Sequence, residues 1–450
     1  MPLAIMPVGL VISIAVLVFA AAFKKIHPFF ALIAAAIIFS LFSGMNPDQV
    51  FTAFFDGLGD TVASVGLIIA IGTITGMLLQ NCGGAEAMAR AILKRTGTRN
   101  ADLGMALTGY FVSLAVFCDA AYVILAPLAR KLSALSQTSM ATMALSLSFA
   151  MLTTNQLIPP TAGPMAAAGV LGVDMGMAIM LSMLVSIPVI AMSCFLARRF
   201  GRDSRYEYFV DEDTLSLLSD ENASGPSATE AFLPILLPLA LMMTKTFYGM
   251  LMPTEGVVWE GLTILGQPAV ALLIGLLLAV RTYRRVKPED KQVATYDGVF
   301  GDALKTAGQI TLIVAVGGGF GGLLKASPLQ DVMTSLLAGF NIGLLAPFII
   351  GVVLRTAIGS ASITLLTGAS MIGPMLGVLG LGSPEGAIIA MLALGAGASM
   401  IVHGNDNYFW MVSSCSGMKT ETAFKLIPKT SVILSLTALA ATWLLKLVLI

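Results

Sequence analysis

Residues 153–164 read TTNQLIPPTAGP, and this polar, proline-rich stretch interrupts the middle of the long apolar segment Thr138–Leu171. A second apolar segment, Ala387–Ser413, is interrupted in the same way by HGNDNY at residues 403–408. Prolines and glycines at membrane depth free backbone amides and carbonyls, which is tolerated only where protein or a watery cavity satisfies them. We predict two broken helices whose half-helix ends face a ligand; the alternative is two proline-kinked helices without one.

The rest of the chain is similarly apolar. Of its 450 residues, 57% are hydrophobic and 11% are charged, and the mean hydropathy is +0.90, whereas a soluble domain carries about 25% charged residues. Apolar runs of about 20 residues, long enough to cross the hydrocarbon core of a bilayer, recur along most of the sequence. The composition predicts an all-α integral membrane protein. The net charge is zero, and no Lys/Arg-rich block of the kind that suggests nucleic-acid binding occurs.

Short basic loops set the orientation of the predicted spans. The positive-inside rule places the Lys/Arg clusters in the cytoplasm; they occupy residues 24–25, 90–99, 130–131, 198–205, 281–291 and 419–429. Both termini then lie outside, as do the stretches Asp48–Asp60 and Thr254–Glu260. The apolar segment Leu103–Leu128 has basic residues on both sides, which predicts a re-entrant hairpin with its turn near Cys118–Ala121.

The second half of the chain repeats the pattern of the first. Gly59-Asp60 followed by glycines 66, 72 and 76 corresponds to Gly301-Asp302 followed by glycines 308, 317 and 321. We predict two inverted-topology repeats of about five transmembrane helices, each with a re-entrant hairpin and a broken helix. Residues 1–197 form the first repeat, 198–230 a cytoplasmic linker and 231–450 the second repeat. The glycines of GGGFGG at 317–322 lie in an apolar span, so Gly317 and Gly321 are assigned to helix packing.

Ionisable side chains at membrane depth are costly unless they are paired or solvated, so they mark candidate sites. The predicted topology places four there: Asp119, Arg355, His403 and Asp406. Arg355 either binds a substrate carboxylate with its planar fork or pairs with an aspartate. Asp119, Asp406 and His403 are the candidates for coupling to a proton or cation, with arginine pairing or interhelical hydrogen bonding as the alternatives.

Small polar residues accompany these charges at the predicted hairpin turns and helix breaks. The second hairpin turn lies within Arg355–Thr364, and its hydroxyls can bind a ligand or pack helices together. The substrate-binding candidates that join Arg355 are Ser360, Ser362, Thr364, Thr154, Asn155 and Asn405. The four cysteines lack CxxC spacing, so we expect no metal site, and neither a cofactor nor a catalytic motif is predicted.

Four stretches of the chain resemble the gluconate permease (gluconate:proton symporter) family, a branch of the ion transporter superfamily. They are Asn81–Ala85, the Pro159-Pro160-x-x-Gly163-Pro164 break, Leu354–Ala361 and Asn405-Asp406-x-x-Phe409-Trp410. The resemblance runs over nearly the full chain and implies an elevator-type carrier that moves sugar acids or related hydroxy acids together with protons. Family members commonly carry Glu at position 119, Gly at 121 and histidines at 155 and 161, where this chain has Asp, Ala, Asn and Thr. These departures allow a shorter hydroxy acid than gluconate or another polar organic anion.

We therefore expect a secondary active transporter in the cell inner membrane, not an enzyme. It would import a small hydroxy-carboxylate or sugar acid by proton-coupled symport. The expected partners are this organic anion, the coupling proton or sodium ion, the lipid bilayer and further copies of the chain. A sodium-coupled symporter is the alternative, since Asp, Asn, Ser and free carbonyls also bind hard cations. A passive anion channel is less favoured because the polar residues gather in two clusters rather than along a pore.

Overall fold

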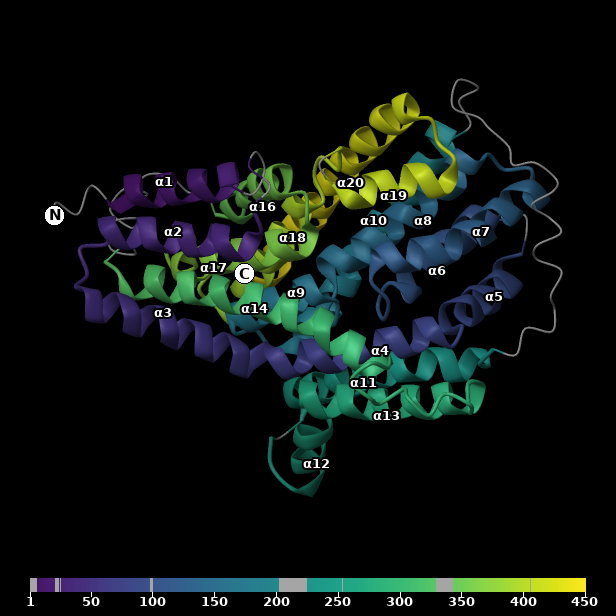
Figure 1. Cartoon of the computed structure of the whole chain (residues 1–450), viewed down its shortest axis with the longest axis horizontal. Helices are drawn as coiled ribbons and strands as arrows, with labels where there is room; N and C mark the ends of the chain where they lie inside the picture. Colours follow the sequence, from purple (N-terminus) through teal and green to yellow (C-terminus); the bar gives the residue numbers. More distant parts are fainter. Residues whose placement is uncertain are drawn as a thin grey trace.

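The computed structural model describes residues 6–20, 24, 26–97, 100–201, 225–252, 254–328, 343–404 and 406–450. Within these ranges the chain is helical and contains no strand, so the predicted all-α class is confirmed (Figure 1). The helices of the first half are α1 (Met6–Val18), α2 (Pro28–Phe42), α3 (Pro47–Thr61), α4 (Leu67–Asn81), α5 (Gly84–Thr96), α6 (Ala101–Val112), α7 (Cys118–Ser136), α8 (Met140–Leu157), α9 (Ala162–Leu171) and α10 (Met175–Gly201). Those of the second half are α11 (Ala228–Leu251), α12 (Val257–Leu265), α13 (Pro268–Val286), α14 (Val299–Ala326), α16 (Leu345–Ile358), α17 (Ala361–Ile372), α18 (Pro384–Ala398), α19 (Asn407–Ser416) and α20 (Thr420–Leu449).

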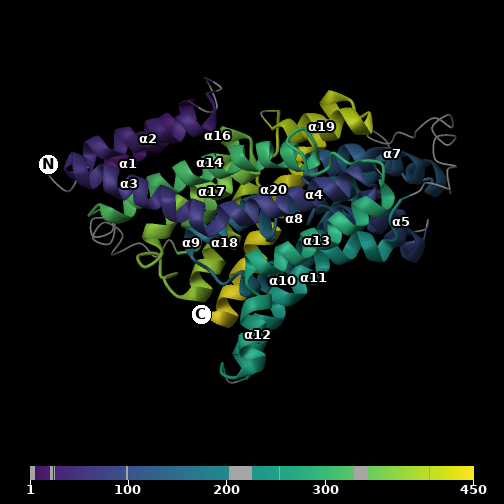
Figure 2. The ribbon, with the colours of Figure 1, turned by 60° about the horizontal axis from the view of Figure 1, so that its bottom comes forward.

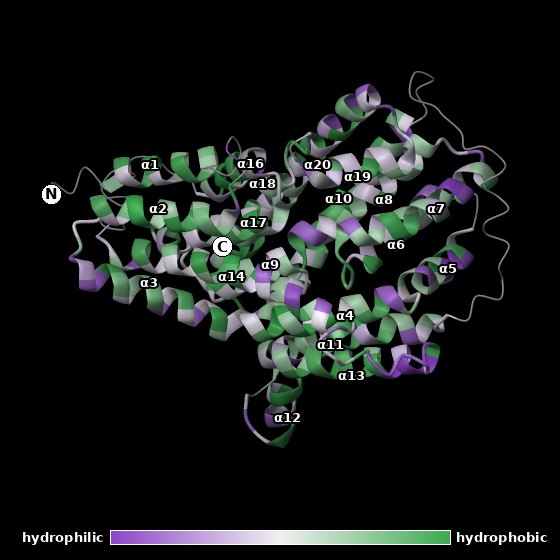
Figure 3. Ribbon diagram, viewed as in Figure 1, coloured by the Kyte–Doolittle hydropathy of each residue, from purple (hydrophilic) through white to green (hydrophobic). Residues whose placement is uncertain are grey.

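Helices able to cross a bilayer occur in both halves. Among the described residues, four helices are long and apolar enough, α10, α11, α14 and α20, and the bent pairs α3–α4 and α12–α13 raise the number to six. Figure 3 shows hydrophilic stretches at the ends of α5 and α7 and beyond α13, on one end of the molecule, and further ones near the start of α3 and around α12. The stretches at α5, α7 and α13 belong to the basic clusters that the sequence places on one side, whereas the orientation of the termini stays a prediction.

Two stretches expected as outside loops contain helices. Asp48–Asp60 lies within α3, which begins with a capping box: the Asn46 side chain accepts from the Gln49 N–H at 2.9 Å, and Gln49 accepts from the Asn46 N–H. The acidic residues of this stretch favour a loop only if the helix cap formed by Asn46 and Gln49 is not considered. The stretch Thr254–Glu260 enters α12, which meets α13 at a 65° bend and projects from the body of the molecule (Figure 2).

Both long apolar segments are interrupted where the sequence predicts. The first helix, α8, ends at Leu157, since Pro159 and Pro160 have no N–H to continue its ladder. The Thr161 hydroxyl donates to the Ile158 carbonyl oxygen at 2.6 Å, which satisfies one freed acceptor. In the second half, α18 and α19 are separated by residues 399–406, and the Val402 N–H donates to Ser431 of α20 at 3.0 Å.

The hairpin candidates also appear as paired helices. The first pair, α6 and α7, is joined by residues 113–117, and the second, α16 and α17, by Gly359 and Ser360. Gly359 has a φ of +74°, a left-handed conformation that glycine adopts without strain and that allows the tight reversal. Of the predicted linker, residues 198–201 extend α10 and Ser227 caps α11, while 202–224 lie outside the described residues.

Packing partners in the two halves correspond. The first hairpin helix packs on the first broken helix, α6 on α8, as α16 packs on α18. The closing helix α10 packs on α8, and the closing helix α20 packs on α18. The two halves contact each other where α9 of the first half meets α17 of the second, and where α19 of the second half meets α7 of the first. The two hairpin turns and the two helix breaks are thereby brought to the middle of the fold, where the cavity described below is found.

The helices α3 and α14 approach each other through glycines. A Cβ on Gly318 would overlap the Thr61 hydroxyl and lie 2.8 Å from the Gly57 carbonyl oxygen. A Cβ on Gly57 would lie 3.0 Å from the Gly322 Cα, so the contact is tight from both sides. Only residues without a side chain permit such an approach of two helix backbones.

Candidate functional site

A cavity of about 170 Å³ lies between the two hairpin turns and the two broken helices. It receives side chains from four parts of the chain that are distant in sequence: the start of α7, the end of α8, the second hairpin turn and the start of α19. Its lining consists of Phe117, Cys118, Asp119, Leu152, Asn155, Arg355, Gly359, Ser360, Ala361, Ser362, Asp406 and Tyr408. Six of these residues are candidates that the sequence selected, and the fold brings them together.

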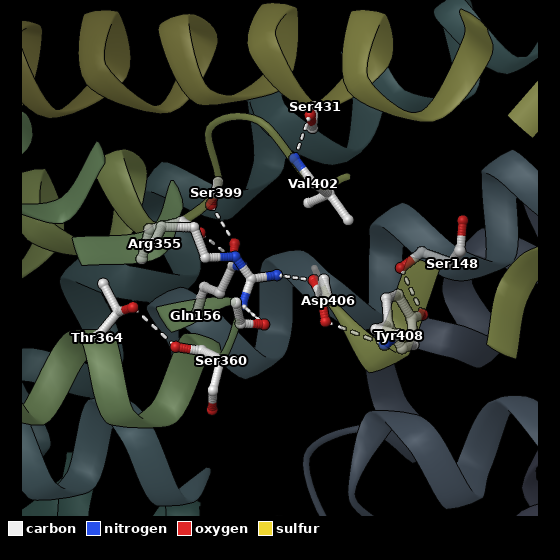
Figure 4. A network of polar contacts seen from close by, with 12 residues as sticks. Ser148, Gln156, Arg355, Ser360, Thr364, Ser399, Val402, Asp406, Tyr408 and Ser431 are labelled. Atoms are coloured by element: carbon white, nitrogen blue, oxygen red, sulfur yellow. Dashed lines mark hydrogen bonds and ion pairs between the residues drawn. The ribbon is translucent and has the colours of Figure 1, made fainter. Parts of the chain in front are cut away.

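Arg355 sits in the last turn of α16 with only 2% of its side chain exposed. Its Nη1 donates to the Gly359 carbonyl oxygen at 3.2 Å, and its Nη2 is ion-paired with Asp406 Oδ2 (Figure 4). The third donor group, Nε, is buried and has no hydrogen-bond partner among the described residues. The guanidinium therefore forms the aspartate pair that the sequence left open, and at the same time it lines the cavity with unused donor capacity.

Asp406 makes two contacts, one through each carboxylate oxygen. It caps the N-terminus of α19, where its Oδ1 accepts the Tyr408 N–H at 2.9 Å, and its Oδ2 faces Arg355. Its side chain is 7% exposed, so the charge pair is buried on both sides. A buried pair is held by mutual attraction and by hydrogen bonds to the remaining atoms, and losing either partner leaves an uncompensated charge.

The other candidates in the lining carry polar groups from different elements. Asp119 lies in the first turn of α7 and is exposed, which places a carboxylate near the favourable end of that helix dipole. Asn155 is 5% exposed and lies at the end of α8. Ser360 and Ser362 are partly buried at the second hairpin turn.

Three candidates do not line the cavity. The Thr154 hydroxyl donates to the Tyr110 carbonyl oxygen at 3.1 Å, which ties α8 to α6. The Thr364 hydroxyl donates to the Ser360 carbonyl oxygen at 2.7 Å, so it shapes the start of α17 (Figure 4). His403 is partly buried in the loop before α19, where its carbonyl oxygen accepts the Asp406 N–H at 2.9 Å. Asn405 lies outside the described residues.

Sequence reasoning missed two residues of this region. Tyr408 lines the cavity, and its hydroxyl donates to the Ser148 carbonyl oxygen of α8 at 2.9 Å. Gln156 lies beside Asn155, and its Nε2 donates to the Ala398 carbonyl oxygen at 3.0 Å while its Oε1 accepts from Ser399. Both belong to the polar interruptions, so a rule that selects every hydrogen-bonding side chain in a broken helix would have found them.

A second, smaller cavity of about 50 Å³ adjoins the first and shares Phe117 and Asn155 with it. It lies between the first hairpin turn and α4, where a Cβ on Gly76 would overlap the Ala115 carbonyl oxygen. Among the described residues, no group of three or more His, Cys, Asp or Glu side chains could hold a metal ion.

The fold is similar to that of a solved membrane transporter. The chain is similar to the YdaH transporter of Alcanivorax borkumensis, with a TM-score of 0.62 and 18% identity over 89% of this chain and 88% of that one. The chain belongs to the GntP permease family, since residues 5–448 match the family model for GntP family permeases. It is therefore a permease and not an enzyme.

Relatives within the family carry different names. The gluconate permease of Pseudomonas aeruginosa is 31% identical over 432 residues, covering 94% of each chain. The D-serine transporter DsdX of Escherichia coli is 29% identical over 441 residues, covering 97% of each chain. Both relatives are matched along almost their whole length, so the likeness extends to the entire membrane body.

Proposed function

We propose that this permease is a proton-coupled symporter of the inner membrane that imports a small hydroxy-carboxylate or sugar acid, such as gluconate or a shorter relative. The observation that carries the proposal is the buried guanidinium of Arg355 in the wall of a small polar cavity. An arginine fork matches the geometry of a carboxylate and remains charged at every working pH.

The remaining groups of the cavity suit hydroxyl-bearing carbons. Ser360, Ser362 and Asn155 supply hydroxyl and amide groups that both donate and accept hydrogen bonds. A volume of about 170 Å³ is below the range of about 300–1,000 Å³ that is typical of sites for drug-sized ligands, so the substrate is small. The gluconate permease among the relatives supports a sugar acid, and the name of DsdX, a D-serine transporter, supports a shorter carboxylate that carries a hydroxyl group.

Cys118 provides a direct test of binding. It lines the cavity and is partly exposed, whereas Cys82 and Cys194 are buried. In a Cys415→Ser background, a bound hydroxy acid is expected to slow the reaction of Cys118 with N-ethylmaleimide several-fold. Acids of three to six carbons should rank by the concentration that gives half-protection. Equal labelling rates with and without every acid would contradict the proposed site.

We further propose that the two halves are inverted repeats and that transport follows an elevator mechanism. The order of hairpin, broken helix and closing helix is the same in both halves, and the packing partners correspond. One pair of contacts differs: α14 packs along α17, with Gly321 beside Ser370, whereas α4 approaches the turn of the first hairpin, where a Cβ on Gly76 would overlap the Ala115 carbonyl oxygen. In an elevator mechanism, the hairpins and broken helices slide as one body against the other helices. The α14–α17 contact would then shrink, and the contact of α4 with the first hairpin would grow.

A cross-link across this contact tests the movement. A Cβ on Gly321 would lie 3.3 Å from the Ser370 Cβ, close to the separation of about 3.5–4.5 Å in a disulfide. The Gly321→Cys/Ser370→Cys double variant, without the native cysteines, should lose transport almost completely on oxidation and regain it on reduction. Each single variant under the same oxidant is the control. Full transport by the cross-linked protein would show that α14 and α17 move as one body.

The coupling groups remain proposals. Asp119 and Asp406 lie in the cavity lining, whereas His403 lies in the adjoining loop. Sodium is the alternative coupling ion, and uptake into liposomes with an imposed proton or sodium gradient separates the two. Homo-oligomeric assembly, the division at residues 198–230 and the outside location of both termini are further parts of this proposal.

A further inference from the structure

Arg355 and Asp406 form a buried charge pair inside the cavity that would receive an anion. In the structure, Asp406 occupies Nη2 of the guanidinium, and Gly359 occupies Nη1. The two edges of the guanidinium that offer a pair of donors, Nη1 with Nη2 and Nε with Nη2, both include Nη2. A substrate carboxylate that uses the arginine fork therefore has to take the position of Asp406. The site therefore presents one guanidinium to two carboxylates.

We propose that the substrate carboxylate displaces Asp406 from Arg355 and that the released Asp406 takes up the transported proton. This inference rests on the proposed hydroxy-carboxylate transport and assigns its coupling step to one residue. The exchange is balanced: the Arg355–Asp406 ion pair, a substrate carboxylate and one proton give an Arg355–substrate ion pair and a neutral Asp406 carboxylic acid. No covalent bond other than the new O–H bond forms.

The charges in the cavity explain why movement of the substrate would be linked to movement of the proton. The empty site carries one positive and one negative charge on this pair, and the fully loaded site again carries one of each. A site with substrate but without the proton would hold two carboxylates against one guanidinium, and such a net charge at membrane depth is costly. Substrate without a proton, or a proton without substrate, is therefore disfavoured, and a monocarboxylate would cross with one proton and no net charge.

The neighbouring groups favour Asp406 over Asp119 and His403 as the residue that takes up the proton. Its Oδ1 accepts the Tyr408 N–H at 2.9 Å, and this bond does not use the oxygen Oδ2 that faces Arg355. The other ionisable groups that face it are Asp119 and Cys118 from α7, Tyr408 on α19 and His403 in the preceding loop. Among the described residues, α8 and α20 place no ionisable side chain in the lining. Asp119 is exposed and forms no ion pair with Arg355 among the described residues, so substrate binding breaks no direct contact between the two.

The first measurement needs no substitution. Calorimetric binding of the preferred hydroxy acid to the purified protein, in two buffers of different ionisation enthalpy, gives the number of protons taken up per substrate. We expect one proton, and the dissociation constant should rise about tenfold per pH unit where free Asp406 is ionised. Binding without proton uptake would overturn the exchange and leave the proposed substrate intact. Failure of every hydroxy acid to bind would overturn both.

Variants then assign the proton. Asp406→Asn should bind the acid without proton uptake and with an affinity that no longer depends on pH, while Asp406→Glu should restore uptake. Asp297→Asn in an exposed loop should keep the uptake of one proton, and Asp119→Asn tests the other carboxylate of the cavity. If Asp406→Asn does not fold, the proton uptake of the Asp406→Glu and Asp119→Asn variants still tests which carboxylate takes up the proton. Proton uptake that persists in Asp406→Asn, or disappears in Asp119→Asn, would contradict the assignment.

Discussion

Replacing Arg355 with lysine is expected to weaken binding of the carboxylate substrate by about 10- to 100-fold. Lysine keeps the charge but loses the planar fork, so the contacts to Gly359 and Asp406 and an incoming carboxylate cannot be made together. Hydrogen bonds to charged groups contribute about 1.5–3 kcal/mol each, and about 1.4 kcal/mol corresponds to a factor of ten in affinity. Equilibrium binding of the purified variant measures the loss directly.

Arg130 provides a matched control for this substitution. Its Nε donates to the Cys415 carbonyl oxygen at 3.0 Å, so it joins α7 to the end of α19 without lining the cavity. Arg130→Lys should reduce stability slightly and leave the dissociation constant near that of the parent. If Arg355→Lys binds as tightly as Arg130→Lys, then Arg355 serves only to hold Asp406 in place.

The exposed carboxylate at the cavity is expected to exclude dicarboxylates. Asp119 lines the cavity without an ion pair among the described residues, so a second carboxylate on the ligand would meet a like charge. Asp119→Asn should therefore raise the affinity for a dicarboxylate relative to a monocarboxylate of equal length. Competition binding measures this ratio, and an unchanged ratio would mean that Asp119 does not face the distal end of the ligand.

The helix breaks could be predicted because their cause is local. Pro159 and Pro160 remove backbone donors wherever they occur, and glycine and asparagine around residue 404 favour an interruption. The partner of Arg355 could not be predicted in the same way. Asp406 lies 51 positions away, and only the packing of α16 against α18, and of α19 against α7 and α8, brings it to the guanidinium.

Helix packing by glycine illustrates the same limit. The sequence assigns Gly317 and Gly321, which lie on one side of the helix, to close packing. Gly321 does pack closely, since a Cβ there would lie 3.2 Å from the Ser370 carbonyl oxygen. In the structure, a Cβ on Gly317 would find only contacts of 3.4 Å or more to Leu366 and Ser370, which are ordinary. The tightest approach belongs instead to Gly318 and Gly322, which face α3. Gly317 and Gly318 are consecutive residues, so their sides of the helix differ by about 100° around the helix axis.

Gly318→Ala is expected to destabilise the protein by about 1–3 kcal/mol or more, because the added methyl group has no free volume. Its Cβ would overlap Thr61 Oγ1, whose hydroxyl already donates to the Gly57 carbonyl oxygen at 2.8 Å, and the backbone of α3 would have to move. Gly308→Ala in the same helix is the matched control, since a Cβ there meets nothing within 4 Å. Removing a helical glycine at an open position should instead stabilise by about 0.5–1 kcal/mol. Thermal unfolding of the two purified variants measures both effects. An equal or higher melting temperature for Gly318→Ala than for Gly308→Ala would mean that α3 and α14 are not held in this close contact.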